Sequence, residues 1–297
     1  MISHWIAAAR LRTLPLSVSG ILLGTLIARV ETQIDWLIFW LSVLTAILFQ
    51  VLSNFANDLG DALSGADARR VGEARMVASG LISSGAMKVA ILVTGFLSLI
   101  SGVLLVLIAL REVPTWIFVF FLLLAASSVW AAVSYTYGAF AYGYRRMGEV
   151  FVITFFGFVA VGGSYYLQTK HWNSCVLLPG LSAGMLASAV LNLNNMRDLD
   201  TDLASGKRTI ANLLGFKGSK FYHIFLVTVP MILTGLFIQF CGYGSYSFLY
   251  LLVLPAAIAH CISVLKTSNS KSFDSELKKM ALLTLLFVLL LGFGINM

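Results

Sequence analysis

Apolar runs, each about as long as a membrane-spanning helix, make up most of this sequence. A bilayer core about 30 Å thick takes roughly 20 apolar residues per helix. Only 11% of the 297 residues are charged, compared with about 25% in soluble domains, and the mean hydropathy is +0.91. The sequence therefore predicts an all-α, polytopic membrane protein. Its nine expected helices lie at 14–29, 35–57, 89–109, 115–136, 148–168, 174–196, 221–241, 245–265 and 278–296.

Lys and Arg residues are distributed unequally between the expected loops. If the N-terminus is cytoplasmic, 17 of the 20 basic residues lie on that side, and Arg29, Arg111 and Lys170 lie on the other. Cytoplasmic loops of membrane proteins carry an excess of Lys and Arg. We therefore expect a cytoplasmic N-terminus and, after nine helices, a C-terminus outside. This topology also explains the net charge of +7, so the charge does not indicate a nucleic-acid partner.

Two of the apolar runs end in clusters of Asn and Asp on the expected cytoplasmic side. They are N-F-A-N-D-L-G-D at residues 54–61 and N-L-N-N-M-R-D-L-D-T-D at residues 192–202. At about 100° per residue, most of these side chains share one helical face in each cluster, and Asp200 points away. The shared faces hold Asn54, Asn57, Asp58 and Asp61 in the first cluster, and Asn194, Asn195, Asp198 and Asp202 in the second.

Clustered carboxylates repel one another unless a cation joins them. Carboxylate and amide oxygens suit Mg²⁺, which often bridges protein carboxylates and substrate phosphates. Basic residues in the loops that follow could offset the charge of a diphosphate leaving group. Helix capping remains an alternative for any single residue, but it explains two paired clusters poorly. We therefore predict a Mg²⁺–diphosphate site.

Other features are less specific. The four tyrosines between residues 135 and 144 are typical of an interfacial aromatic belt more than of a substrate pocket. Glu149 begins a helix, where capping and catalysis are both open. The three cysteines lie far apart and predict neither a metal site nor a disulfide. The similar ends of the second and sixth helices suggest an internal pseudo-repeat, helices 1–4 and 5–8, within a single domain of residues 1–297.

Both acidic motifs resemble the signature loops of the UbiA-type intramembrane prenyltransferases. The matching stretches are N-D-L-G-D-A-L-S-G-A-D at 57–67 and L-N-N-M-R-D-L-D-T-D-L-A-S-G-K-R-T at 193–209. R-L-R-T-L-P at 10–15 and S-Y-T-Y-G at 134–138 are similar to the 1,4-dihydroxy-2-naphthoate polyprenyltransferase branch of menaquinone synthesis. The resemblance implies one bundle around a central cavity that opens to lipid, in a bacterial cytoplasmic (inner) membrane.

The activity that the resemblance implies is Mg²⁺-dependent transfer of a polyprenyl group from polyprenyl diphosphate to 1,4-dihydroxy-2-naphthoate. Loss of CO₂ would then give demethylmenaquinone. One alternative keeps this chemistry and changes the aromatic acceptor, for example to 4-hydroxybenzoate. Another is a cation-coupled secondary transporter, which would place its acids near mid-membrane on broken helices.

The resemblance also implies the roles of individual residues. Gly65 stands where relatives commonly carry an acid, and Asp67 would substitute for it. The expected catalytic residues are Asp58, Asp61, Asp198 and Asp202. The expected metal ligands are Asn54, Asn57, Asp58, Asp61, Asp67, Asn194, Asp198 and Asp202. The expected diphosphate contacts are Arg70, Arg75, Arg197 and Lys207.

Overall fold

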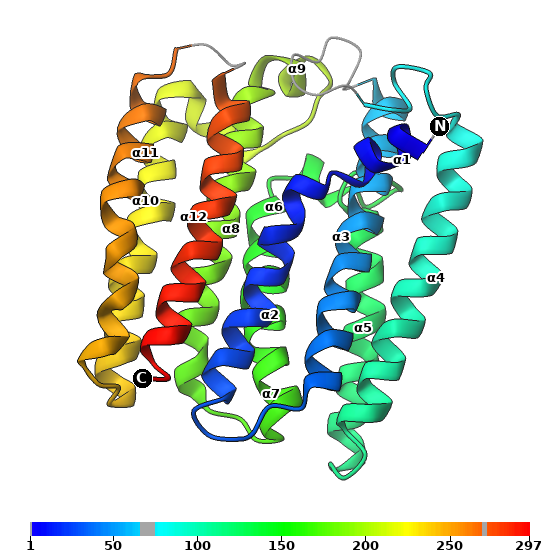
Figure 1. Cartoon of the computed structure of the whole chain (residues 1–297). Helices are drawn as coiled ribbons and strands as arrows, with labels where there is room; N and C mark the ends of the chain where they lie inside the picture. The colour runs from blue at the N-terminus through cyan, green and yellow to red at the C-terminus, as the bar shows by residue number, and fades with distance from the viewer. Residues whose placement is uncertain (1, 66–74, 269–271) are drawn as a thin grey trace.

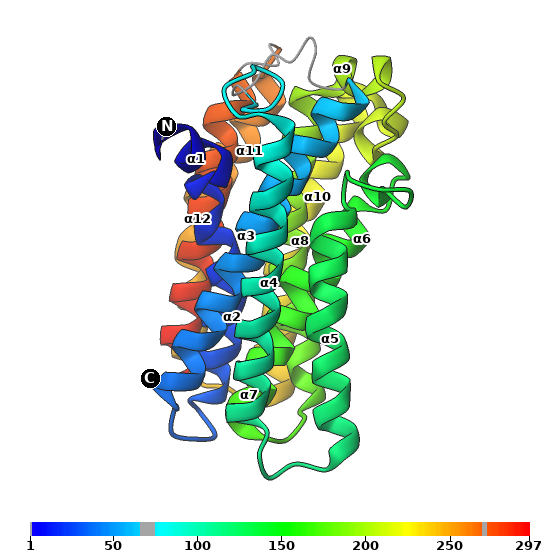
Figure 2. The same cartoon turned by 90° about the vertical axis from the view of Figure 1, so that its right-hand side faces the viewer.

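The computed structural model describes residues 2–65, 75–268 and 272–297. Within these residues, nine helical segments are long and apolar enough to cross a membrane. They run side by side in one bundle, with the N- and C-termini at opposite ends, as two views show (Figures 1 and 2). The prediction of an all-α, nine-span membrane protein is confirmed.

The helices are numbered along the chain, with η for short or irregular helices. The order is α1 (Ile2–Ala9), η1 (Leu11–Thr13), α2 (Leu14–Ala28), α3 (Trp36–Ser64), α4 (Ser84–Ala109), α5 (Thr115–Ser134), η2 (Tyr142–Tyr144), α6 (Gly148–Val152), η3 (Ile153–Gly162), α7 (Gly163–Thr169), η4 (Ser174–Val176), α8 (Leu177–Arg197), α9 (Leu199–Ala204), α10 (Ile210–Cys241), η5 (Ser245–Val253), α11 (Leu254–Lys266) and α12 (Phe273–Gly294).

Two predicted loops are partly helical. The helix α3 begins after Asp35, whose side chain accepts from the amides of Leu37 and Ile38. It continues to Ser64 and ends at Gly65, whose φ of 77° favours glycine. The interval 58–88, between the helices expected at 35–57 and 89–109, is predicted as a loop, which is wrong for residues 58–64 and 84–88. The interval 197–220 is likewise wrong as a loop at Arg197 and where α9 and the start of α10 lie. The first acidic cluster consequently lies on α3, and the second lies on α8 and α9 with Asp198 between them.

Helix α8 lies at the centre of the bundle, where it packs against η3, α10 and α12. The close approach of η3 and α8 depends on glycines. A Cβ on Gly184 would lie 2.9 Å from the backbone of Ile153, and one on Gly157 would lie 2.4 Å from the carbonyl oxygen of Gly180. The segment η3 is a π-helix that joins α6 to α7 within one span. Such segments are frequent at functional sites.

The prediction that the cysteines form no disulfide is wrong. Cys175 in η4 and Cys241 at the end of α10 are 66 residues apart in sequence but form a disulfide, with their Cα atoms 6.5 Å apart. They meet because η4 and α10 both end at the same end of the bundle, against the start of α8. Spacing along the chain could not reveal this contact.

Candidate active site

The first acidic cluster lies on the last turns of α3, and its carboxylates are buried. Both oxygens of Asp58 accept hydrogen bonds from backbone amides of the following segment, those of Met76 at 3.0 Å and Val77 at 2.9 Å. Asp61 accepts from Arg75 Nη2 at 2.9 Å and from the Tyr144 hydroxyl at 3.1 Å. Asp58 therefore fixes the segment that contains Arg75, and Arg75 in turn forms an ion pair with Asp61.

The second cluster spans the end of α8 and the short helix α9. Arg197 is fully buried and donates to both oxygens of Asp198, at 2.8 and 2.7 Å. It also donates to Asn194 Oδ1 at 2.6 Å and to Asp274 Oδ1 of α12 at 2.7 Å. Asp202, one turn beyond Asp198, lies 3.3 Å from Lys207 Nζ. Arg197 thus fixes Asn194 and Asp198 relative to α12.

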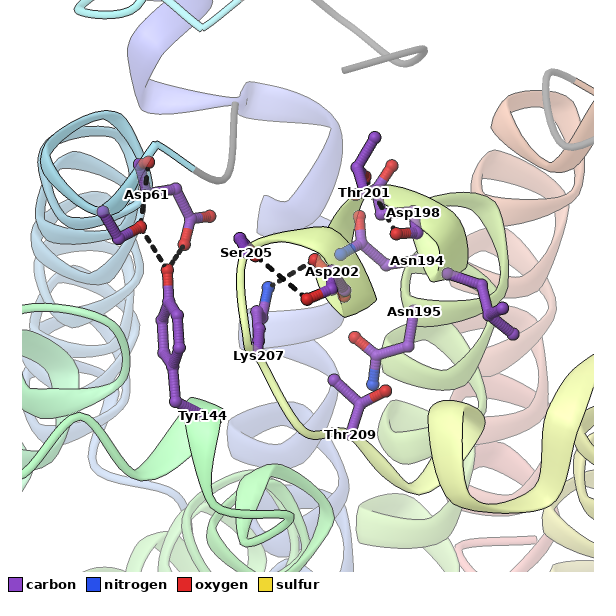
Figure 3. A network of polar contacts seen from close by, with 12 residues as sticks. Asp61, Tyr144, Asn194, Asn195, Asp198, Thr201, Asp202, Ser205, Lys207 and Thr209 are labelled. Carbon is purple, nitrogen blue, oxygen red and sulfur yellow. Dashed lines mark hydrogen bonds and ion pairs between the residues drawn. The ribbon is translucent and has the colours of Figure 1, made fainter. Parts of the chain in front are cut away.

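A backbone pairing brings the two clusters together. The amide of Arg146 donates to the carbonyl of Arg208 at 2.8 Å, and the amide of Arg208 donates to the carbonyl of Tyr144 at 3.3 Å. This pairing places Lys207 5.8 Å from the ring centre of Tyr144, the residue that contacts Asp61. Lys207 consequently lies between Asp202 and Tyr144, with Asp61 beyond the tyrosine (Figure 3).

The titration behaviour reflects this convergence. Burial raises the pKa of Asp202 to about 6; Lys207 lowers it, and Asp198 and Asp61 raise it further. Burial lowers the pKa of Lys207, but Asp61 and Asp202 more than offset that effect, so its pKa is raised overall. Carboxylates from both halves of the chain therefore act on the same buried ammonium group.

The donor set fits a hard divalent cation. Within the described part of the chain, Asn57 Oδ1 and Asp202 Oδ2 are buried oxygens without a hydrogen-bond partner. Such orphaned acceptors are costly unless a ligand satisfies them. In the same residues, no three His, Cys or carboxylate side chains converge on one point. A cation here would therefore take part of its coordination from a substrate, as Mg²⁺ commonly does with phosphates.

A pocket of about 330 Å³ begins beside these clusters and extends into the bundle. Asn57 and Asn194 line its mouth, and Ser42 lies at its far end. Asn57 and Ser42 are 15 residues apart on α3, which corresponds to roughly 22 Å at 1.5 Å per residue. The deep part lies among α3, α4, α5, η3 and α7, because α8 contributes no lining residue before Ala187 and α12 contributes none after Ala281.

The deep wall is effectively apolar although hydroxyl groups line it. Ser42, Ser128 and Ser164 each donate to a backbone carbonyl four residues earlier in their own helices. The floor is built from residues that also belong to a buried hydrophobic cluster. These residues are Leu105, Val106, Phe121 and Leu167. The pocket therefore suits a long hydrocarbon chain whose polar head remains at the acidic clusters.

Tyr135 and Tyr142 also line the mouth of this pocket, and Tyr144 donates to Asp61. The belt interpretation is therefore wrong for these three tyrosines. Burial raises the pKa of each, so all three hydroxyls stay protonated at neutral pH. The position of S-Y-T-Y-G near a helix end indicates that these tyrosines lie close to the acidic clusters, but it does not distinguish a pocket from a belt.

Several predicted residues are occupied in other contacts. The amide group of Asn54 donates to the carbonyl of Ala9 and the hydroxyl of Thr13, and its oxygen accepts from Gln50. Glu149 is buried in the first turn of α6, where Asn195 Nδ2 lies 3.5 Å from its carboxylate. Asp200 is exposed, as the helical wheel predicts. Asp67 and Arg70 lie outside the described residues, so their expected roles remain predictions.

Comparisons with known proteins agree with the family resemblance of the two acidic motifs. The model of the UbiA prenyltransferase family matches residues 17–286. A protein of Escherichia coli (strain K12) named 1,4-dihydroxy-2-naphthoate octaprenyltransferase is 38% identical over 290 residues, which cover 96% of this chain and 94% of that protein. A protein of the same name from Haemophilus influenzae is 35% identical, with 98% and 95% covered.

Two solved structures share the fold. One, described as a UbiA homolog from Archaeoglobus fulgidus bound to GPP and Mg²⁺, superposes with a TM-score of 0.60 at 14% identity, over 99% of this chain and 100% of that one. The other, from work on digeranylgeranylglyceryl phosphate synthase, has a TM-score of 0.62 at 17% identity, over 100% and 99%. At these identities the likeness concerns the fold alone.

Proposed function

This chain belongs to the UbiA prenyltransferase family, and we propose that it transfers a polyprenyl group from polyprenyl diphosphate to 1,4-dihydroxy-2-naphthoate. The transfer is accompanied by loss of the acceptor's carboxylate as CO₂ and gives diphosphate and demethylmenaquinol, the reduced form of demethylmenaquinone. The observation that carries this proposal is the meeting of two carboxylate clusters around Lys207 at the mouth of a deep apolar pocket. The names of the E. coli and H. influenzae relatives support the choice of acceptor.

We infer that Mg²⁺ is held by oxygens of Asn57, Asp58, Asp61, Asp198 and Asp202, with Asn54 and Asn194 adjacent to them. The Mg²⁺ named in the description of the A. fulgidus homolog supports this inference. When bound, Mg²⁺ supplies positive charge against the diphosphate. Arg75 and Lys207 supply further positive charge at the place where negative charge develops on the departing diphosphate. Arg197, whose guanidinium is fully engaged, orients Asp198 and Asn194.

The pocket is suited to the step that follows departure of the diphosphate. Its apolar wall would hold the prenyl chain and exclude water from the allylic cation that departure of diphosphate leaves behind. Tyr135, Tyr142 and Phe151 place aromatic rings at the mouth, and the stacked pair of Tyr142 and Phe151 has ring centres 3.8 Å apart. Aromatic faces attract cations. The transporter alternative fits less well, because α3 runs unbroken through Asp58 and Asp61.

The protein purified into lipid should form prenylated naphthoquinol and CO₂ from 1,4-dihydroxy-2-naphthoate, a polyprenyl diphosphate and Mg²⁺. Chelation with EDTA should lower the rate at least a hundredfold, because the diphosphate would leave without the cation's charge, and added Mg²⁺ should restore it. Supplying 4-hydroxybenzoate in competition tests the acceptor. Prenylated hydroxybenzoate as the main product would overturn the acceptor but not the chemistry; no prenyl transfer to either compound would overturn both.

We further propose that the acidic clusters and the N-terminus face the cytoplasm and that the C-terminus lies outside, in a single catalytic domain. The distribution of Lys and Arg supports this orientation. The disulfide provides independent support, because it lies at the opposite end of the bundle from the clusters and disulfides persist in oxidising compartments. Alkaline phosphatase fused after Met297 should therefore be active in cells, whereas a fusion after Gly206 should be inactive; the reverse pattern would refute the orientation.

A further inference from the structure

The mouth of the pocket carries a second group of charges, separate from the acidic clusters. Arg10, Arg12 and Lys278 line it, and no carboxylate does so among the described residues. Two of these cations come from the N-terminal segment between α1 and α2, and the third comes from α12. An apolar pocket whose charged lining, in the described part of the chain, consists of three cations is suited to an anion with an apolar body.

The N-terminal segment is held in place by specific contacts. Asn54 Nδ2 donates to the carbonyl of Ala9 at 2.9 Å and to Thr13 Oγ1 at 3.2 Å, and Thr13 Oγ1 donates to the carbonyl of Arg10 at 2.9 Å. Arg10 itself has a φ of 51°, a left-handed conformation that is unusual for a residue other than glycine. Strained residues of this kind persist where the surrounding contacts fix them, and they are frequent at ligand sites.

The reaction proposed above brings two anionic groups to this region, the diphosphate of one substrate and the carboxylate of the other. The diphosphate has its own cations: Arg75 and Lys207 are paired with the acidic clusters, and neither lines the pocket. The three lining cations face the pocket itself. The aromatic carboxylate is the anion that comes close to them, because its ring must enter the pocket to meet the prenyl chain.

We propose that Arg10, Arg12 and Lys278 form a carboxylate subsite that selects aromatic acids over neutral aromatics as acceptors. This inference rests on the proposed function and adds a determinant of acceptor specificity to it. Charge-assisted contacts are the strong hydrogen bonds of such sites, and the planar guanidinium groups of Arg match a carboxylate geometrically.

One contact provides a competing explanation for Arg12. Its Nη1 lies 4.0 Å from Asp274 Oδ1, the atom to which Arg197 donates at 2.7 Å. Arg12 could therefore act on the second acidic cluster through Asp274 and Arg197. That role would change the binding of Mg²⁺ and diphosphate, whereas a carboxylate subsite would change only the preference between acceptors. The test must measure both quantities.

The probes are two unreactive competitors that differ by one carboxylate, 1-hydroxy-2-naphthoate and 1-naphthol. Their inhibition constants are measured against 1,4-dihydroxy-2-naphthoate for the wild type and for Arg10→Gln, Arg12→Gln and Lys278→Gln. The wild type should bind the acid more tightly. Each of the two Arg variants should lower that preference about tenfold or more, the usual loss for one hydrogen bond to a charged group. Arg12→Lys should recover part of it.

The matched control is Lys266→Gln, because Lys266 is an exposed cation at the end of α11 that does not line the pocket. It should leave the preference unchanged. An unchanged preference in all three lining variants would overturn the subsite. A higher KM for Mg²⁺ or polyprenyl diphosphate in Arg12→Gln, with the preference intact, would assign Arg12 to the Asp274 contact instead. Failure of the wild type to turn over the naphthoate would refute the proposed function, and the competitors' direct binding to the protein would still test the subsite.

Discussion

Asp202→Asn is expected to lower kcat/KM by about a hundred- to a thousandfold while the protein remains folded. The amide keeps the shape of the side chain but removes the charge that faces Lys207 and the cation. Among the described residues, Asp202 Oδ2 is a buried carboxylate oxygen without a hydrogen-bond partner, so it is well suited to coordinate Mg²⁺. Loss of one group that stabilises developing charge usually costs this much. The measurement is initial rate against the concentrations of donor and Mg²⁺.

The control lies two residues earlier in the same short helix. Asp200→Asn removes an identical charge from α9, but Asp200 is exposed and points away from Lys207. Its kcat/KM should stay within about twofold of wild type, since exposed charges contribute little. Equal losses in the two variants would indicate a general electrostatic effect of α9. Retention of more than a tenth of the activity in Asp202→Asn would remove Asp202 from the metal site.

The helices and the faces of both clusters could be predicted because each depends on short-range patterns. Apolar runs of bilayer length identify the spans, and a 100° rotation per residue places Asp58 and Asp61 together on α3. The same rotation separates Asp200 from Asp202, which the structure confirms. These inferences need no knowledge of which helices are neighbours.

Contacts between distant segments could not be predicted in this way. Tyr144 meets Asp61 only because the residue after it pairs with Arg208, 63 positions further along the chain. Asp274 reaches Arg197 across 77 positions, and Cys175 reaches Cys241 across 66. Each contact depends on how the helices pack. Charge patterns indicated that Lys207 and Arg75 lie near acids, but the identity of each partner follows from the fold.

The surroundings of glycines within the spans are another feature that the sequence leaves open. Gly163 and Gly184 both lie within membrane-spanning segments, yet they have opposite surroundings. A Cβ on Gly184 would collide with the backbone of Ile153, whereas one on Gly163 would meet no atom within 4 Å. Gly163 lines the pocket one helical turn before Leu167, a residue of the floor. Its side-chain position therefore points to space that a prenyl chain could fill.

Gly163→Phe is expected to lower the rate with a long-chain polyprenyl diphosphate at least a hundredfold and to spare a short donor such as geranyl diphosphate. The backbone at this position is compatible with a side chain, because Gly163 has helical φ and ψ of −64° and −51°. Phe also has a higher helix propensity than Gly, so the thermal unfolding temperature should not fall. The ring would occupy the deep part of the pocket, where only a long chain extends, and would displace that chain's reactive end from the acceptor.

A graded series separates a steric block from general disruption. The loss with the long donor should grow from Gly163→Ala to Gly163→Leu to Gly163→Phe. The short donor should show little change across the series. Gly85→Phe is the control, because Gly85 is a second helical glycine with open space around its Cβ, but it lies outside the pocket. Equal losses with both donors would indicate general disruption of the site, whereas no loss with either donor would mean that the prenyl chain does not reach Gly163.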